Sequence, residues 1–294
     1  MLEYNSVAEL IHEAENQGRS ISGVVIDDQA ESMGLTKQRL FEDMRRNLDV
    51  MRVAARNGTS ETLKSRSGLS GGNGFRMTRY AASEGGLEPL SGAFCAVAMS
   101  KAIAIAEYNA AMGRIVAAPT AGSCGILPAA ILTVEDFYKI PERKLVMSLF
   151  TAGGIGLVVA KNASIAGAEG GCQAECGSAA ALAAAALVEL RDGDPVQAAE
   201  ACAIALKNQL GLVCDPVAGL VEVPCIKRNA GGVMCAIAAA DMALAGIKSM
   251  IPVDEVISAM REIGDALPAS LRETALGGLA ATLTGQSLKQ KIFG

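Results

Sequence analysis

The near absence of aromatic side chains from a strongly apolar sequence most constrains the fold of this chain. Of its 294 residues, 51% are hydrophobic but only 3% are aromatic, and tryptophan is absent. The apolar fraction excludes a disordered chain and provides for a sizeable core. That core has to be packed with Ala, Leu, Ile, Val and Met. The small side chains in such an alanine-rich core let helices approach closely. We therefore expect an all-α fold.

Apolar residues recur with helical periodicity along most of the sequence. In the first stretch, Val7, Leu10, Ile11 and Ala14 form one stripe. No run alternates as strands do, and no linker divides the chain, so we expect a single helical domain spanning residues 1–294. Further helices are expected over residues 22–33, 36–57, 89–112, from 126, 141–154, 173–191, 195–210, 230–245 and 253–263, with a short terminal stretch.

Three segments rich in glycine, proline or serine interrupt the helical pattern. They are Lys64–Gly74 (KSRSGLSGGNG), the motif APTAGSCG at residues 118–125, and Gly211–Asn229. Glycine and proline at this density are typical of loops. Because binding and catalytic residues concentrate on loops held by a rigid scaffold, we expect the functional residues there.

Charge and composition exclude several classes of protein. The net charge of −5 with no dominant basic block argues against nucleic acid as a partner. The N-terminal segment is acidic and amphipathic, unlike a secretory signal. The longest uncharged run, residues 115–134, contains Pro119 and Pro128, so we expect a buried loop rather than a membrane span. We predict a cytoplasmic protein whose cysteines are not a disulfide framework.

The cysteines fall into two groups by context. Three lie in helical text with small neighbours and are expected to pack as small hydrophobes: Cys95, Cys202 and Cys235. Cys172, Cys214 and Cys225 instead lie in or beside loops marked by glycine or proline, in the contexts GGCQAECG, LVCDPVAG and VEVPCIKRN. Thiolates that converge on a metal from separate backbone segments need this kind of setting. No CxxC pair is present, which argues against a structural zinc site.

Long segments of the chain resemble the iron–sulfur-dependent L-serine dehydratases, specifically the alpha subunit of the two-chain form. The resemblance is carried by GAEGGCQAECGSAAA, LGLVCDPVAGLVEVPCIKRNA, APTAGSCGILPA and the upstream SRSGLSGG, and it spans essentially the whole chain. It implies a helical catalytic domain and a [4Fe–4S] cluster bound by Cys172, Cys214 and Cys225. Cys176 and Cys124 are the competing ligands, although we expect Cys176 to pack behind the cluster and Cys124 to line the active site.

The resemblance also implies an activity and a partner. The reaction is β-elimination of water from L-serine, which gives pyruvate and ammonia, with an open cluster iron as Lewis acid. Removing the α-proton needs a general base. The only histidine, His12, lies in an amphipathic stretch beside Glu9 and Glu13 and is expected to be exposed. We therefore expect a beta subunit, in a hetero-oligomer, to supply the base.

Two loops are candidates for holding the substrate. In the first, Ser65, Ser67 and Gly68 offer hydroxyls and successive amides of the kind that bind a carboxylate. In the second, Thr120, Gly122 and Ser123 are candidates for orienting the amino or hydroxyl group. Residues 227–229 (KRN), which follow Cys225, either supply positive charge to the cluster or face water.

Other functions stay open at this point. Similar cluster chemistry would serve an L-threonine dehydratase or an L-cysteine desulfidase, and a non-catalytic iron–sulfur protein would need no substrate loop. The motif SGGNG at residues 70–74, with Lys64, also suggests a pyridoxal-phosphate dehydratase. Those enzymes are α/β proteins, whereas no strand pattern flanks this loop.

Overall fold

The computed structural model describes residues 4–294, so the first three residues of the acidic N-terminal segment lie outside it. Within the described range there is no β-strand, only one isolated backbone bridge between Cys214 and Arg272. The expected all-α class is thereby confirmed. The helices are α1 Val7–Asn16, α2 Ile21–Met33, α3 Lys37–Asn57, α4 Asn73–Ala81, α5 Gly92–Ala110, α6 Ile126–Tyr138, α7 Glu142–Asn162, α8 Gly167–Gly170, α9 Ser178–Leu190, α10 Pro195–Lys207, α11 Cys225–Leu244, α12 Val253–Ala266 and α13 Leu283–Phe293.

Four short helical turns complete the chain. A π-helix, η1 (Gln173–Gly177), leads directly into α9, and three 3₁₀ turns follow later: η2 (Val217–Gly219), η3 (Ala269–Leu271) and η4 (Gly278–Ala281). A π-helix is rare, and single turns of this kind often mark functional sites. Here η1 begins directly after Cys172.

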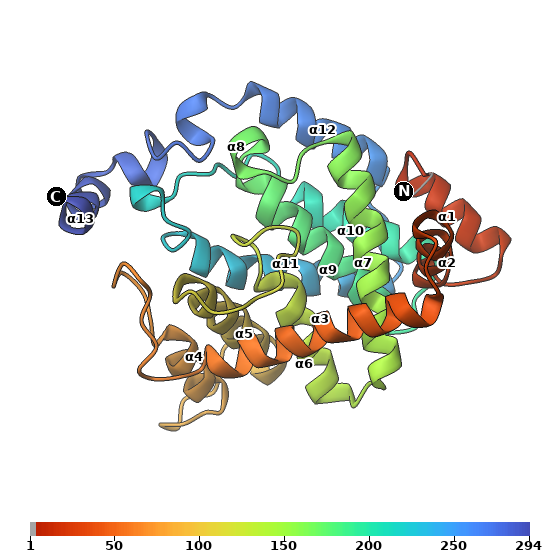
Figure 1. Ribbon diagram of the computed structural model, residues 1–294, viewed down its shortest axis with the longest axis horizontal. Coiled ribbons are helices and arrows are strands. Elements are labelled where there is room, and N and C mark those ends of the chain that lie inside the picture. The colour runs from red at the N-terminus through yellow and green to blue at the C-terminus, as the bar shows by residue number, and fades with distance from the viewer. Residues whose placement is uncertain (1–3) are drawn as a thin grey trace.

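The alanine-rich helix α9 forms the centre of the molecule (Figure 1). It contacts α6, α7, α10 and α11, and all of its residues except Glu189 are buried. Alanine side chains allow these backbones to approach closely, as the shortage of aromatic residues suggested. Cys172 lies immediately before η1, the turn that leads into α9.

Local signals in the sequence explain where the N-terminal helices begin. The side chains of Ser6, Ser20 and Thr36 each accept a hydrogen bond from the backbone N–H three residues later, at 3.0, 3.2 and 3.2 Å. Asp194 and Gln197 form a reciprocal capping box at the start of α10. Each cap satisfies backbone donors that the first turn leaves free.

The structure differs from the expected helices in three places. Helix α7 does not end at Gly154 but continues to Asn162. The glycine instead allows close packing against α2, since a Cβ at this position would lie 2.4 Å from Val25 Cγ2. Helix α4 was not expected; it follows Gly72 directly. Helix α11 begins at Cys225, inside the segment expected to be irregular up to Asn229.

The run 115–134 was expected to be a buried loop, but only its first part is one. Residues from Ile126 onward form the buried start of α6. Among the described residues one helix, α7, is long and apolar enough to cross a membrane, and 61% of its apolar window is buried inside the protein. A core helix of a soluble protein passes the same test, so this finding carries little weight.

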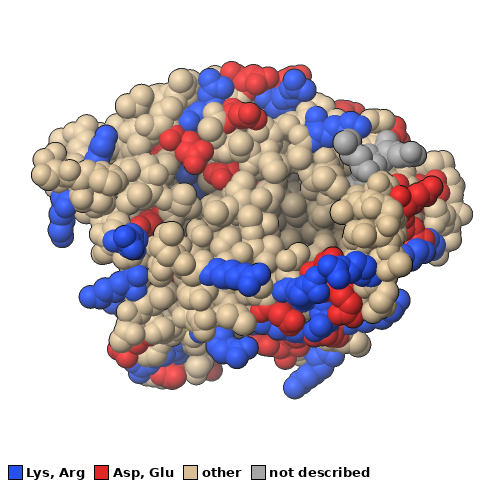
Figure 2. Space-filling model, viewed as in Figure 1, with Lys and Arg blue, Asp and Glu red and all other residues tan. Residues whose placement is uncertain are grey.

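Charged side chains of both signs alternate over the face shown in Figure 2. Along α3 many of them are paired within the helix, as in Arg39 with Asp43 and Arg45 with Asp49. Arg52 joins α3 to Glu135 of α6 and Glu142 of α7. The charges of this face therefore largely neutralise one another.

Candidate active site around three buried cysteines

Cys172, Cys214 and Cys225 come together from three separate segments. Cys172 directly precedes η1, Cys214 lies in the extended segment after α10, and Cys225 is the first residue of α11. They are 2%, 4% and 9% exposed. The charges of Cys214 and Cys225 each interact with that of Cys172 and with one another. We call this cluster the cysteine basin.

The thiols of the basin differ in electrostatic surroundings. A hydrogen bond from Cys176, together with the Arg228 guanidinium, lowers the pKa of Cys172 despite its burial. Burial raises the pKa of Cys225 to about 12 and raises that of Cys214 still further, where the nearby Glu175 carboxylate adds to the effect. Binding a metal through Cys214 and Cys225 would therefore release their protons.

Arg228 turns into the basin, whereas its neighbour Lys227 is exposed. Its guanidinium donates to the Val213 carbonyl and to Asp215 Oδ1, both at 2.8 Å. This resolves the alternatives for residues 227–229: Arg228 brings positive charge to the thiols, and Lys227 faces water.

The C-terminal part of the chain holds Cys214 in place. The Cys214 amide donates to the Leu271 carbonyl at 2.8 Å, and the Cys214 carbonyl accepts from the Glu273 amide at 2.7 Å. The neighbouring Asp215 accepts from the Leu279 amide at 2.8 Å. Segments more than fifty residues apart thus fix the position of this cysteine.

The basin fits a cluster better than a single ion. Within residues 4–294, no three His, Cys, Asp or Glu side chains are drawn together closely enough to hold one metal ion. A cubane sets a different requirement, because its ligands bind different irons and surround a volume rather than a point. Three buried thiols from three segments match that donor set. The backbone also comes close to Cys214, since a Cβ at Gly167 would lie 3.0 Å from its sulfur.

The loop 118–125 contributes Thr120, Gly122 and Ser123 beside the basin. Thr120 Oγ1 donates to Glu175 Oε1 at 2.7 Å and lies 3.2 Å from Ser123 Oγ. The other oxygen of this carboxylate, Oε2, lies 3.7 Å from the Cys214 sulfur. Glu175 therefore links the candidate substrate loop to a candidate cluster ligand.

Asn229 fixes the same loop to the start of α11. Its side chain is fully buried, donates to the carbonyls of Gly122 (2.8 Å) and Cys225 (2.9 Å), and accepts from the Gly125 amide (2.8 Å). The position of the loop relative to Cys225 therefore depends on one amide side chain.

The upstream loop is joined to the basin segment by a protein carboxylate. Glu222 accepts from Ser67 Oγ at 2.7 Å and from Ser70 Oγ at 2.6 Å, while Ser65 Oγ lies 3.3 Å from Ser67 Oγ. Gly68 adopts a left-handed conformation with φ of 76°. Because the Ser67 hydroxyl already donates to Glu222, a substrate carboxylate would have to use other donors of this loop. Its role in substrate binding stays a prediction.

The remaining cysteines are separate from these three, except for Cys176. Cys124 is fully buried in the hydrophobic core, where burial raises its pKa to about 12, and its place along the site stays a prediction. Cys176 is 1% exposed and hydrogen-bonds Cys172, so it packs directly against the basin. The other three lie inside helices α5, α10 and α11, as expected: Cys95, Cys202 and Cys235.

Sequence reasoning missed Glu175 and Glu222, and it expected Asn229 to supply charge or to face water, whereas its side chain is fully buried and holds the 118–125 loop. All three belong to the quoted cysteine segments, so the signal was present: a carboxylate or an amide in an otherwise small and apolar motif. His12 is exposed on α1 and Lys64 is exposed in a loop between α3 and α4, as expected for residues without a catalytic setting.

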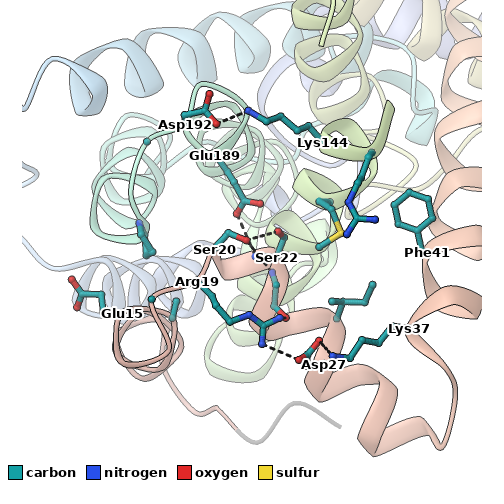
Figure 3. A pocket seen from close by; sticks show the side chains of 18 of the residues that line it. Glu15, Arg19, Ser20, Ser22, Asp27, Lys37, Phe41, Lys144, Glu189 and Asp192 are labelled. Carbon is teal, nitrogen blue, oxygen red and sulfur yellow. Dashed lines mark hydrogen bonds and ion pairs between the residues drawn. The ribbon is translucent and has the colours of Figure 1, made fainter. Parts of the chain in front are cut away.

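A cavity of about 920 Å³ lies between α2, α3, α7 and the end of α9 (Figure 3). Its charges are largely paired: Arg19 and Lys37 share Asp27, and Lys144 pairs with Asp192. Glu189 is held there by the Thr151 hydroxyl and the Ser22 amide. No cysteine lines this cavity. The thiol chemistry therefore belongs to the basin alone.

The chain is similar to known proteins over most of its length. The family model described as serine dehydratase alpha chain matches residues 15–280. A probable L-serine dehydratase alpha chain of Bacillus subtilis (strain 168) is 52% identical over 291 residues, which cover 99% of this chain and 96% of the relative. The L-serine dehydratase alpha chain of Peptoniphilus asaccharolyticus is 43% identical over 289 residues, 98% of either chain. L-serine dehydratase TdcG of Escherichia coli (strain K12) is 46% identical over 181 residues, 61% of this chain and 40% of that relative.

Proposed function

This chain belongs to the serine dehydratase alpha chain family, and we propose that it is the cluster-binding chain of an enzyme that converts L-serine to pyruvate and ammonia. The observation that carries the proposal is the convergence of Cys172, Cys214 and Cys225 in one buried basin. The loop 118–125 lies beside them through Glu175, which places a candidate substrate loop next to the candidate ligands.

The proposed cofactor is a [4Fe–4S] cluster held by these three cysteines. When bound, it supplies a Lewis acid at the iron that no protein thiolate occupies, which stabilises the negative charge that develops as the C–O bond of serine breaks. Arg228 would offset part of the negative charge of the thiolates, because it already contacts Cys172.

The side chains of this chain would position the substrate and keep water out. Asn229 fixes the 118–125 loop against α11, and Thr120 fixes Glu175 beside Cys214. Groups held in this way lose little freedom when the substrate binds, which is how positioning contributes to rate. Burial of the basin further strengthens each electrostatic contact within it.

The general base is proposed to come from a beta chain. The sequence contains one histidine, His12, and it is exposed on α1 rather than in the basin. The names of the relatives as alpha chains agree with a two-chain form. An active site completed by a second chain would explain why this large domain has no histidine near its thiols.

The test is anaerobic co-expression with a beta chain, followed by iron and sulfide analysis and by assays on L-serine, L-threonine and L-cysteine. We expect about four irons and four sulfides per chain, with pyruvate and ammonia formed from L-serine. Preferred turnover of L-threonine or L-cysteine would assign the chain to one of the alternative activities. A protein that holds iron but turns over none of the three would be a non-catalytic iron–sulfur protein.

A further inference from the structure

Glu175 lies where the substrate loop meets the basin. Its Oε1 accepts the Thr120 hydroxyl at 2.7 Å, and its Oε2 lies 3.7 Å from the Cys214 sulfur. The residue belongs to the π-helix η1, three residues after Cys172. Unlike its buried neighbours in η1, it is only partly buried.

Two glycines bring backbone close to this carboxylate. A Cβ at Gly122 would lie 3.2 Å from Oε1, and a Cβ at Gly167 would lie 2.5 Å from Oε2. The second distance is shorter than any real contact, so no larger residue fits at Gly167 without moving Glu175. The carboxylate is therefore held between two backbone segments, with its position fixed by Thr120.

No cation in the described part of the chain forms an ion pair with Glu175. The charge of Arg228 reaches Glu175 and opposes the rise of its pKa, but the Arg228 guanidinium itself donates to Asp215 and the Val213 carbonyl. The other charge that reaches Glu175 is that of Glu273, which is negative. A partly buried carboxylate with neutral donors only is a receptor for a positively charged group.

An ammonium group has a positive charge and three N–H donors, whereas the side chains that hydrogen-bond Glu175 in this structure are one hydroxyl, from Thr120, and one thiol, from Cys214.

We propose that Glu175 binds the α-ammonium group of the substrate. This rests on the proposed function, because it takes the substrate to be an amino acid bound beside the cysteines. It assigns to this chain the recognition of the amine, while Glu222 keeps the hydroxyls of the upstream loop occupied. Glu175 thereby becomes a specificity-determining residue for amino acids over hydroxy acids of the same length.

The test compares Glu175→Gln with wild type in the anaerobic complex with its beta chain. The amide keeps the shape and an acceptor for Thr120 but removes the charge. We expect iron and sulfide contents equal to wild type, and a KM for L-serine raised about 10- to 100-fold, as for a charge-assisted hydrogen bond. L-Alanine, which keeps the ammonium, should lose affinity as an inhibitor to the same extent, and 3-hydroxypropanoate, which lacks it, should not.

Glu189→Gln is the matched control. Glu189 is also largely buried and also accepts from a threonine hydroxyl, but it lies in the distant cavity of Figure 3. The Glu189→Gln variant should leave the KM for L-serine and the inhibition constants of L-alanine and 3-hydroxypropanoate at their wild-type values. Glu175→Asp, which keeps the charge on a shorter side chain, should show a smaller rise in KM than the glutamine variant.

An unchanged KM in Glu175→Gln, or equal weakening of L-alanine and 3-hydroxypropanoate, would overturn the assignment. Loss of iron from both Glu175→Gln and Glu175→Asp would also overturn it, since Glu175 would then support the cluster. Failure of the wild-type complex to bind a cluster or to dehydrate serine would instead overturn the proposed function.

Discussion

Two sets of buried cysteines in this molecule have similar burial and different surroundings. Cys124 and Cys202 are fully buried among apolar side chains, and burial raises the pKa of each to about 12. The basin cysteines are almost as buried, yet each interacts electrostatically with another basin cysteine and with Glu175, and Cys172 and Cys225 also interact with Arg228. Burial therefore does not distinguish a packing cysteine from a candidate ligand. The presence of partner thiols and of charged groups does.

Replacing single cysteines tests this contrast with the largest effect. Cys172→Ser, Cys214→Ser and Cys225→Ser should each lose most of the iron of the anaerobically purified chain, because a hydroxyl is a poor replacement for a thiolate. Cys202→Ser is the matched control: it should keep its iron and lose roughly 1–3 kcal/mol of stability by burying a hydroxyl in an apolar site. Iron analysis and thermal unfolding measure the two effects.

The assignment of Cys172 as a cluster ligand would be contradicted if Cys176→Ser removed the iron while Cys172→Ser did not. The two residues are one helical turn apart and hydrogen-bonded to one another, so they are the pair for which an exchange of roles is sterically simplest.

The basin also differs from an ordinary lyase site because no histidine lies in it. We expect the isolated chain, loaded with iron, to dehydrate L-serine at a small fraction of the rate of the complex with its beta chain. His12→Ala should leave the rate of the complex unchanged, because His12 is exposed on α1. Full turnover by the isolated chain, measured as pyruvate formed, would show that the base lies within this chain.

A smaller effect is expected where the loop 118–125 is joined to the basin. Asn229→Ala removes three hydrogen bonds and leaves their buried partners unpaired, which should cost roughly 2–4 kcal/mol of stability. Because Cys225 keeps its own place at the start of α11, most of the iron should remain while KM for L-serine rises. Loss of stability without any change in KM would show that the loop does not contact the substrate.

The all-α fold could be predicted from the sequence because it follows from the amino-acid composition. With few aromatic residues and many alanines, helices packed around α9 are the economical way to form a core. The predicted helix boundaries were wrong where contacts between residues distant in the sequence determine where a helix begins or ends. Gly154 looked like a helix end, but it makes room for Val25 of α2. Pro224 looked like part of a loop, but it precedes the first turn of α11.

The candidate site could be predicted from the sequence only in part. The contexts of Cys172, Cys214 and Cys225 set them apart, but their convergence depends on packing that sequence spacing does not encode. Glu175 and Asn229 could not be assigned because their partners lie 55 and more than 100 residues away.

The central claim is that the cysteine basin holds a cluster that meets the substrate directly. Mössbauer spectroscopy of the active complex, with and without saturating L-serine, tests this most directly. With three protein thiolates for four irons, we expect L-serine to change about one quarter of the iron signal and to leave the cluster oxidised. An unchanged signal from all irons during turnover would contradict it and would leave the cluster a structural role.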